Sequence, residues 1–269
     1  MSQERRFFRL TAEGRSIWSM RDKAQLPLEY RRMFGLLDYS GHSSVIRSLL
    51  GRFPRAEVEA SLRTFEELRL VEQAPRPEVG IAELRWQVQA PPLEPEDNTY
   101  YEEVSNFADI SLSRLGVYLP NERLFHRPPS SKALAETLAL VVEDDPDQCA
   151  IAVLRLKSAG YRVAAVASAT ELLRYLRSTM PDAIFLDINL PDGNGFDILA
   201  SLRRHPLLTE LPVAMLTART ERADIARGLA LAADAYVTKP YGANTLEYVL
   251  RCLMKQEAQA ADQQTAQAY

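Results

Sequence analysis

The sequence predicts an α/β protein of two domains, in which a five-stranded, doubly wound parallel sheet follows a small α+β domain. Three observations lead to this fold class. The chain has 269 residues, and a domain has roughly 100–200. Its balance of 46% hydrophobic and 25% charged residues is that of a globular protein. From residue 136 onward, short apolar runs alternate with helical patterns, as in a parallel sheet with crossover helices.

Two proline-rich breaks set the domain boundaries. Residues 91–98 combine prolines with acidic residues, and residues 126–131 contain a second pair of prolines. We therefore expect an N-terminal domain over 1–90, an acidic connector with a helix over 91–135, the sheet domain over 136–256, and a flexible tail over 257–269. The apolar spacing of residues 100–119 predicts the connector helix, as one helix or two short ones.

The sheet domain is built from five strand–helix repeats. The first strand, LALVV, is a continuous apolar run, as expected of a strand covered on both faces. The expected strands are 138–142, 161–166, 183–186, 212–216 and 235–237. The expected helices are 147–157, 170–177, 195–204, 222–232 and 244–254.

The N-terminal half has a different pattern. Residues 7–18 suit a strand or a hairpin around Gly14. Three short helices follow over 28–37, 43–50 and 55–68, separated by Gly41 and Pro54. Two strands over 70–73 and 81–88 then flank a Pro/Gly turn. Three helices and a β-hairpin in this order resemble a winged helix-turn-helix domain.

Composition excludes several classes of protein. The net charge of −4 gives no global basic field for nucleic acid or anionic lipid. The charge is uneven along the chain, with +3 over residues 1–90, −3 over 91–135 and −4 over 136–269. Cys149 and Cys252 fit no zinc motif, and we expect reduced thiols in a cytoplasmic protein. We expect neither a signal peptide nor a membrane span, because no apolar run reaches about 18 residues.

Polar side chains follow the strands at the edge where parallel strands of such sheets end. Glu143, Asp144 and Asp145 follow the first strand, Asp187 the third, Thr217 the fourth and Lys239 the fifth. Such a carboxylate cluster needs a cation, and oxygen ligands favour Mg²⁺. The lysine and the hydroxyl suit a phosphoryl group, with Asp187 as the nucleophile that carries it. Taken singly, Asp144 or Asp145 would cap the next helix and Thr217 would cap the helix near Glu221.

Four motifs resemble the receiver domain of two-component response regulators: LVVEDDPDQ, IFLDINLPDGNGFDIL, VAMLTART and AADAYVTKPY. The spacings of 43, 30 and 22 residues between Asp144, Asp187, Thr217 and Lys239 are also similar. The resemblance implies a flavodoxin-like fold and a phospho-accepting switch, not a turnover enzyme, with self-catalysed phosphorylation and dephosphorylation. It implies Asp187 as acceptor, Mg²⁺ held by Glu143, Asp144, Asp187 and the Asn189 carbonyl, and Thr217 and Lys239 on the phosphoryl oxygens. Tyr236 stands where the family has a switching aromatic, and a half-buried strand residue is the alternative.

The resemblance implies a sensor histidine kinase or a phosphotransfer protein as the phosphoryl donor. For the N-terminal domain two hypotheses stand: transcription regulation through double-stranded DNA, with Arg55, Arg63 and Arg76 as contacts, or a signalling adaptor that binds a protein or dimerises. The net charge of +3 over residues 1–90 and the usual partnership of such domains with receivers favour the first, whereas the acidic residues Glu57, Glu59, Glu66 and Glu67 on the recognition helix favour the second. A homodimer is left open, because Ile225, Ala230 and Ala235 carry no charge where the family's transcription factors have charged residues.

Overall fold

The structure, a computed structural model, describes residues 7–18, 30, 33–34, 37, 55–74, 81, 84–86, 90, 116–119, 129–205 and 207–256. The chain divides into two compact units. The first consists of residues 1–90 with 197–210, and the second of residues 91–196 with 211–269. Each unit is described by itself below.

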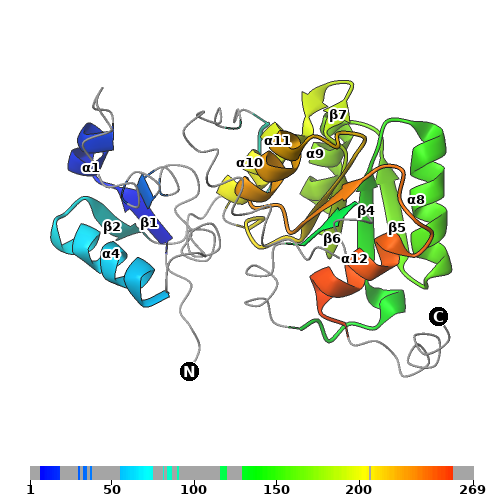
Figure 1. The fold of residues 1–269 in the computed structure, drawn as a ribbon, viewed down its shortest axis with the longest axis horizontal. Coiled ribbons are helices and arrows are strands. Elements are labelled where there is room, and N and C mark those ends of the chain that lie inside the picture. The colour runs from blue at the N-terminus through cyan, green and yellow to red at the C-terminus, as the bar shows by residue number, and fades with distance from the viewer. Residues whose placement is uncertain are drawn as a thin grey trace. The chain divides into compact units, whose positions relative to one another are not determined.

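The second unit holds most of the secondary structure (Figure 1). Its strands are β3 (Val117–Tyr118), β4 (Leu138–Val142), β5 (Arg162–Val166), β6 (Ala183–Leu186), β7 (Asn189–Leu190), β8 (Gly193–Asn194), β9 (Val213–Thr217) and β10 (Ala235–Thr238). Its helices are the short 3-10 helix η4 (Leu134–Glu136), α8 (Pro146–Ser158), α9 (Ala169–Ser178), α11 (Arg222–Ala230) and α12 (Thr245–Met254). Helix α10 (Gly195–Arg204) begins in this unit and continues in the first.

The central sheet has six strands in the order β3-β10-β9-β6-β4-β5. Five of them run parallel, and β3 pairs antiparallel with β10. The prediction of a doubly wound, flavodoxin-like α/β domain is therefore confirmed, with each predicted strand and helix of this domain found within two residues of its expected bounds. The sixth strand was not predicted.

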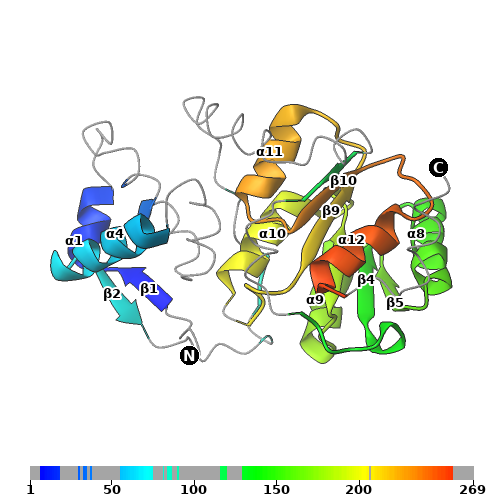
Figure 2. The ribbon, with the colours of Figure 1, turned by 60° about the horizontal axis from the view of Figure 1, so that its bottom comes forward.

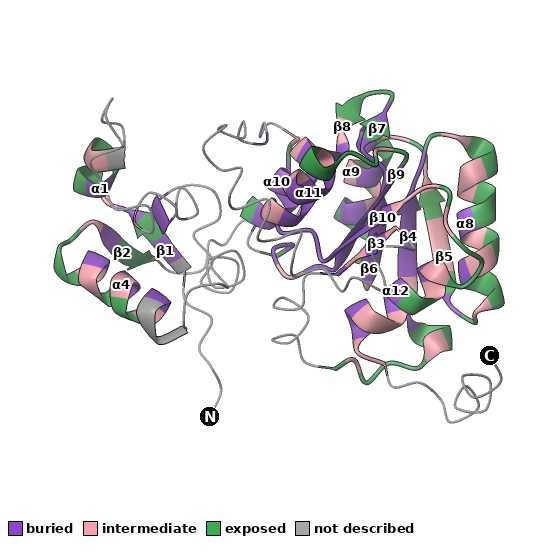
Figure 3. Cartoon of the chain, in the orientation of Figure 1, coloured by how far each residue is buried: buried purple, intermediate pink, exposed green. Residues whose placement is uncertain are grey.

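Helices cover both faces of the sheet (Figure 2). Helices α8 and α12 pack on one face through a core that includes Leu156, Leu250 and Phe185. On the other face, α11 packs on β10, where Gly228 lies against the ring of Tyr236. The residues of β4, β6 and β9 are nearly all buried (Figure 3), as the continuous apolar runs of their sequences predict.

The connector corrects one prediction. A helix was expected over residues 100–119, but residues 117–118 form strand β3 and lie in the sheet. Gly116 has a φ of 71°, in the left-handed region, which does not continue a right-handed helix. The rest of the expected connector helix lies outside the described residues.

The first unit is a small α/β assembly with its own core. Strands β1 (Phe7–Leu10) and β2 (Val71–Ala74) form a two-stranded antiparallel sheet, next to α1 (Ala12–Trp18) and α4 (Arg55–Glu67). Phe65 of α4 is fully buried, with the rings of Phe34 and Tyr30 each 4.9 Å away between centroids. The core also contains Phe8, Leu10, Met33, Leu37, Val58, Leu62 and Val71.

Several predictions for the N-terminal half can be compared with the structure. The helix over 55–68 and the strand over 70–73 are confirmed as α4 and β2. The described residues of 28–37 are helical, whereas 43–50 lie outside the described residues. Residues 7–18 form a strand followed by a helix, not a hairpin around Gly14, because the Thr11 hydroxyl accepts the Gly14 N–H (3.0 Å) and so caps α1. The expected strand over 81–88 is absent from its described residues 81 and 84–86, and β2 pairs with β1 instead.

Among the described residues, no helix is both long enough and apolar enough to cross a membrane.

Candidate functional site

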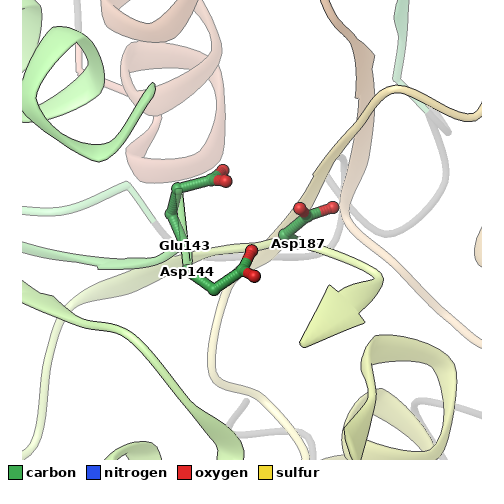
Figure 4. Close-up of side chains that lie close together, drawn as sticks. All are labelled: Glu143, Asp144 and Asp187. Atoms are coloured by element: carbon green, nitrogen blue, oxygen red, sulfur yellow. The ribbon is translucent and has the colours of Figure 1, made fainter. Parts of the chain in front are cut away.

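Three carboxyl groups meet at the carboxyl ends of two neighbouring strands. Glu143 and Asp144 follow β4, and Asp187 follows β6, which pairs with β4 in the sheet. Figure 4 shows the three side chains at one edge of the sheet, and each offers an oxygen within 4.8 Å of the other two. Glu143 and Asp187 are buried, whereas Asp144 is exposed to solvent.

Lys239 brings a positive charge into this cluster from the end of β10. Its Nζ lies 2.5 Å from Glu143 Oε2 and 3.2 Å from Asp187 Oδ2. The side chains of all three residues are largely buried, with exposed fractions of 9% for Lys239, 8% for Asp187 and 2% for Glu143. The other carboxylate oxygen of Asp187, Oδ1, accepts the N–H of Ile188 (2.6 Å), which fixes the orientation of the group.

The electrostatics of the cluster favour an additional cation. Burial raises the pKa of Glu143, although the hydrogen bond and charge of Lys239 act in the opposite direction. The charge of Lys239 therefore does not fully offset the burial of the Glu143 carboxylate, and a divalent ion would add to the compensation. The three carboxylate oxygens lie within 4.8 Å of one another, whereas ligands about 2.1 Å from a single Mg²⁺ are at most about 4.2 Å apart, so small side-chain movements would bring all three onto one ion. An all-oxygen donor set with one exposed side fits a magnesium ion that keeps several waters.

The neighbouring residues Asp144 and Asp145 have different roles, because only Asp145 caps a helix. Asp145 caps α8, since its Oδ1 accepts the N–H groups of Asp147 (2.9 Å) and Gln148 (3.0 Å). The hydrogen bond from the Gln148 N–H is the largest cause of a lowered pKa of Asp145. Because the cap is Asp145, the carboxylate of Asp144 belongs to the acidic cluster and not to the helix.

Thr217 ends β9, next to the cluster in the sheet order. Its side chain is fully buried, and its Oγ1 accepts the N–H of Arg219 (3.2 Å). Helix α11 begins after Glu221, so Thr217 is not the cap of that helix. Asn189 is exposed in β7, in the loop that follows Asp187.

Sequence reasoning missed a contact between these two loops. The guanidinium of Arg219 donates to Asn189 Oδ1 (3.1 Å) and lies 3.5 Å from Asp224. Arg219 stands two residues after Thr217, and this position at a strand end was the only sequence signal. The contact joins the loops that follow β6 and β9.

Tyr236 lies inside the protein, on β10. Its ring is fully buried and its hydroxyl donates to the backbone oxygen of Arg219 (3.1 Å). Burial is the largest cause of the raised pKa of this phenol. A Cβ at position 228 would overlap the ring, so glycine at this position of α11 leaves room for the inward orientation. Tyr236 is thus a strand aromatic that is fully rather than half buried, and its switching role stays a prediction.

The structure describes the three arginines that were predicted to contact DNA only in part. Arg63 is exposed on α4, opposite the buried Val58, Leu62 and Phe65. Arg55 is the first residue of α4. Arg76 lies outside the described residues. The described part of the chain brings no set of these arginines together.

The comparisons with known proteins agree with the site. Residues 139–251 match the family model of the response regulator receiver domain. This part of the chain is therefore a receiver domain of the response regulator family.

The curated relatives match this chain over about half of their own length. It is 36% identical over 126 residues to the transcriptional regulatory protein KdpE of Mycobacterium tuberculosis, covering 47% of this chain and 54% of that protein. It is 33% identical over 128 residues to the transcriptional regulatory protein BaeR of Escherichia coli, covering 46% and 52%. The chain thus spans about half the length of these relatives. Among solved structures, it is similar to the signal receiver domain of a histidine kinase from Syntrophus aciditrophicus, with 31% identity, a TM-score of 0.42, and coverage of 46% of this chain and 96% of that one.

Proposed function

We propose that this protein is a response regulator that is phosphorylated on Asp187 and controls its N-terminal half, which regulates transcription by binding DNA. The observation that carries the proposal is the buried arrangement of Lys239 between Glu143 Oε2 and Asp187 Oδ2, with Asp144 beside them. Buried charges of this kind are costly, and a protein retains them where chemistry requires them.

Phosphorylation is a transfer from an acyl phosphate or a phosphohistidine to the carboxylate of Asp187. A carboxylate oxygen attacks phosphorus, the bond from phosphorus to the leaving atom breaks, and the leaving group departs with the electron pair. Lys239 neutralises charge that develops on the phosphoryl oxygens, and the buried Thr217 hydroxyl donates to one of them. Glu143, Asp144, Asp187 and the Asn189 carbonyl would hold Mg²⁺, which when bound neutralises the remaining negative charge. The same groups would serve self-catalysed hydrolysis.

The phosphorylated receiver differs from the unphosphorylated one in the charge and the volume of the group at position 187. A phosphoryl group adds negative charge and strong acceptor oxygens at Asp187. Thr217 and Lys239 follow those oxygens, and the change reaches Tyr236 through β10, because Lys239 directly follows this strand and Tyr236 lies on it. The receiver is thus a switch between two packings.

Regulation of transcription is supported by the relatives, because KdpE and BaeR are named as transcriptional regulatory proteins. In this chain Arg55, Arg63 and Arg76 would contact DNA phosphates. The second candidate, a signalling adaptor with a protein-binding N-terminal half, is favoured by acidic residues on α4: Glu67 is exposed, and Glu66 accepts a hydrogen bond from Gln73 (2.8 Å). The phosphoryl donor would be a histidine kinase or a phosphotransfer protein, in the cytoplasm, and a homodimer is compatible with either candidate.

Labelling with acetyl phosphate and Mg²⁺ tests the acceptor. Asp187→Asn is expected to abolish the mass increase of one phosphoryl group, because an amide oxygen is a poor nucleophile. Asp192→Asn is the matched control, since Asp192 is an exposed carboxylate of the same loop that binds backbone N–H groups. Equal labelling of the two variants would refute the assignment.

A gel-shift assay with genomic DNA fragments separates the two candidates for the N-terminal half. Binding by the phosphorylated full chain that weakens from low to moderate salt supports transcription regulation, because phosphate contacts release counterions. Replacement of Arg63 by Ala should then weaken binding. No shift at low salt with Asp187 labelled rejects DNA binding and leaves the adaptor.

A further inference from the structure

A segment of the connector closes one edge of the receiver sheet. Strand β3 pairs antiparallel with β10, with Tyr118 opposite Tyr236 and Val117 opposite Val237. Val117 and Leu119 are buried in the core that the sheet shares with α8 and α12. Strand β10 would otherwise end the sheet, so the connector covers an edge that carries unpaired N–H and C=O groups.

Gly116 anchors this strand. Its carbonyl oxygen accepts the Thr238 N–H (2.8 Å) and the Thr238 hydroxyl (3.3 Å). Gly116 has a φ of 71°, and a Cβ at this position would overlap Thr238 Oγ1. Both observations require glycine here, so the pairing depends on a single residue of the connector.

Thr238 connects the strand to the candidate phosphorylation site. It lies opposite Thr217 in the register of β10 and β9. The next residue, Lys239, donates its N–H to the Thr217 oxygen (2.8 Å), and its Nζ contacts Asp187. The two groups that would bind phosphoryl oxygens therefore flank the residue that holds Gly116.

We propose that β3 is a latch: it is paired with β10 in the unphosphorylated receiver and is released when Asp187 is phosphorylated, which passes the signal along the connector to the N-terminal half. This inference rests on the proposed function. A phosphoryl group takes the place of Asp187 Oδ2 as the partner of Lys239, so Lys239 and Thr217 shift, and Thr238 shifts with them. The hydrogen bond from the Thr238 N–H to the Gly116 oxygen is already short (2.8 Å) in the unmodified protein, so a shift of Thr238 away from Gly116 stretches it. Two paired residues are the shortest pairing in this sheet, but release also exposes the buried side chains of Val117 and Leu119, and the contacts of the phosphoryl group must outweigh this cost.

Hydrogen exchange of the full chain tests the release. On labelling with acetyl phosphate and Mg²⁺, we expect the Thr238 amide to exchange at least about 10-fold faster. The Ile184 amide, which donates to Pro212 O (2.8 Å) in the middle of the sheet, should be unchanged. Labelling of Asp187 without faster exchange at Thr238 overturns the latch and leaves the proposed function intact. Absence of labelling overturns both.

A glycine pair tests the reverse direction of the coupling. Gly116→Ala breaks the pairing, whereas Gly160→Ala is matched in backbone strain, with a φ of 92° and no close neighbour. Because coupling between two sites is reciprocal, Gly116→Ala should bind beryllium fluoride, a phosphoryl analogue, about 5-fold more tightly than Gly160→Ala. Equal affinity of the two variants refutes the latch. If Gly116→Ala does not fold, Thr238→Val removes the hydroxyl bond alone, and it must raise the affinity in the same direction or the latch is refuted.

Discussion

One ion pair of the first unit and one charged cluster of the second differ in burial. In the first unit, the ion pair between Arg9 and Glu72 lies on the surface of the small sheet, with side-chain exposed fractions of 64% and 48%. In the second, Lys239, Glu143 and Asp187 are nearly dry at the strand ends. An exposed pair contributes little to stability, whereas a buried cluster costs free energy unless a cation compensates it. The buried charges therefore mark the strand ends of the second unit as the place whose chemistry can be deduced from the described residues.

The first unit has a hydrophobic core of its own, so we expect its stability to be separable from that of the second. Phe65→Ala should lower the free energy of unfolding of the first unit by about 3–5 kcal/mol, because a fully buried ring between two other rings is lost. Phosphorylation of Asp187 should be unchanged. Denaturant unfolding, followed together with acetyl phosphate labelling, checks both. Leu68→Ala, at an exposed leucine after α4, is the control. Loss of labelling in Phe65→Ala alone would show that the units do not fold independently.

Lys239 tests the cost of the buried charges. Without Mg²⁺, Lys239→Met should lower the free energy of unfolding of the second unit by about 3 kcal/mol, because Glu143 and Asp187 lose their counter-ion. Added Mg²⁺ should stabilise the variant more than the original protein. Thermal unfolding with and without the ion measures the difference.

Lys132→Met is the control for Lys239→Met. Lys132 pairs with Asp182 (2.6 Å), but its side chain is half exposed, and the expected loss is under about 1 kcal/mol. Equal losses of unfolding free energy in the two lysine variants would contradict the view that the buried carboxylates at the strand ends need Lys239 as a counter-ion.

The sheet and the strand-end residues could be predicted from sequence because both depend on local patterns. Apolar runs such as LALVV identify buried strands, and the ends of parallel strands meet whatever the loops do. Glu143, Asp144, Asp187 and Lys239 could thus be grouped before their distances were known.

Features that depend on pairing between distant segments could not be predicted. Strand β3 ends a segment, residues 100–119, that has the apolar spacing of a helix, and the conformation of β3 is set by its partner β10, more than 100 residues later in the chain. In the N-terminal half, the Thr11 hydroxyl, which caps α1, also donates to the Arg69 carbonyl (2.6 Å), a contact that no local pattern around Gly14 indicates. In both cases tertiary contacts override a weak local preference.

Asp192 is an exposed carboxylate that stabilises the second unit without taking part in its chemistry. It accepts the N–H groups of Ala169 (2.7 Å) and Thr170 (2.9 Å) and the Thr170 hydroxyl (2.5 Å), at the first turn of α9. Asp192→Asn should lower the free energy of unfolding by about 1 kcal/mol at neutral pH, because the amide loses the charge that favours a helix N-terminus.

The pH dependence of Asp192→Asn follows from the pKa of Asp192. Burial acts to raise this pKa, but the hydrogen bonds from Thr170 and Ala169 outweigh it and lower the pKa below its usual value. A carboxylate with a lowered pKa in the folded state contributes stability above its unfolded pKa, and this contribution is lost as the pH falls through the folded pKa. The unfolding curves of the variant and the original protein should therefore converge in acid. A difference that is constant from neutral pH to acid would contradict this account.

The ion pair of the first unit should have the smallest effect. Arg9 and Glu72 stand opposite each other on β1 and β2, 2.6 Å apart, and both are exposed to water and salt. A double-mutant cycle with Arg9→Ala and Glu72→Ala should give a coupling free energy of at most about 0.5 kcal/mol, and added salt should reduce it further. A coupling above about 2 kcal/mol would place this pair with the buried cluster of the receiver. Charge on the N-terminal surface would then be structural, and less of it would be free for DNA or a protein partner.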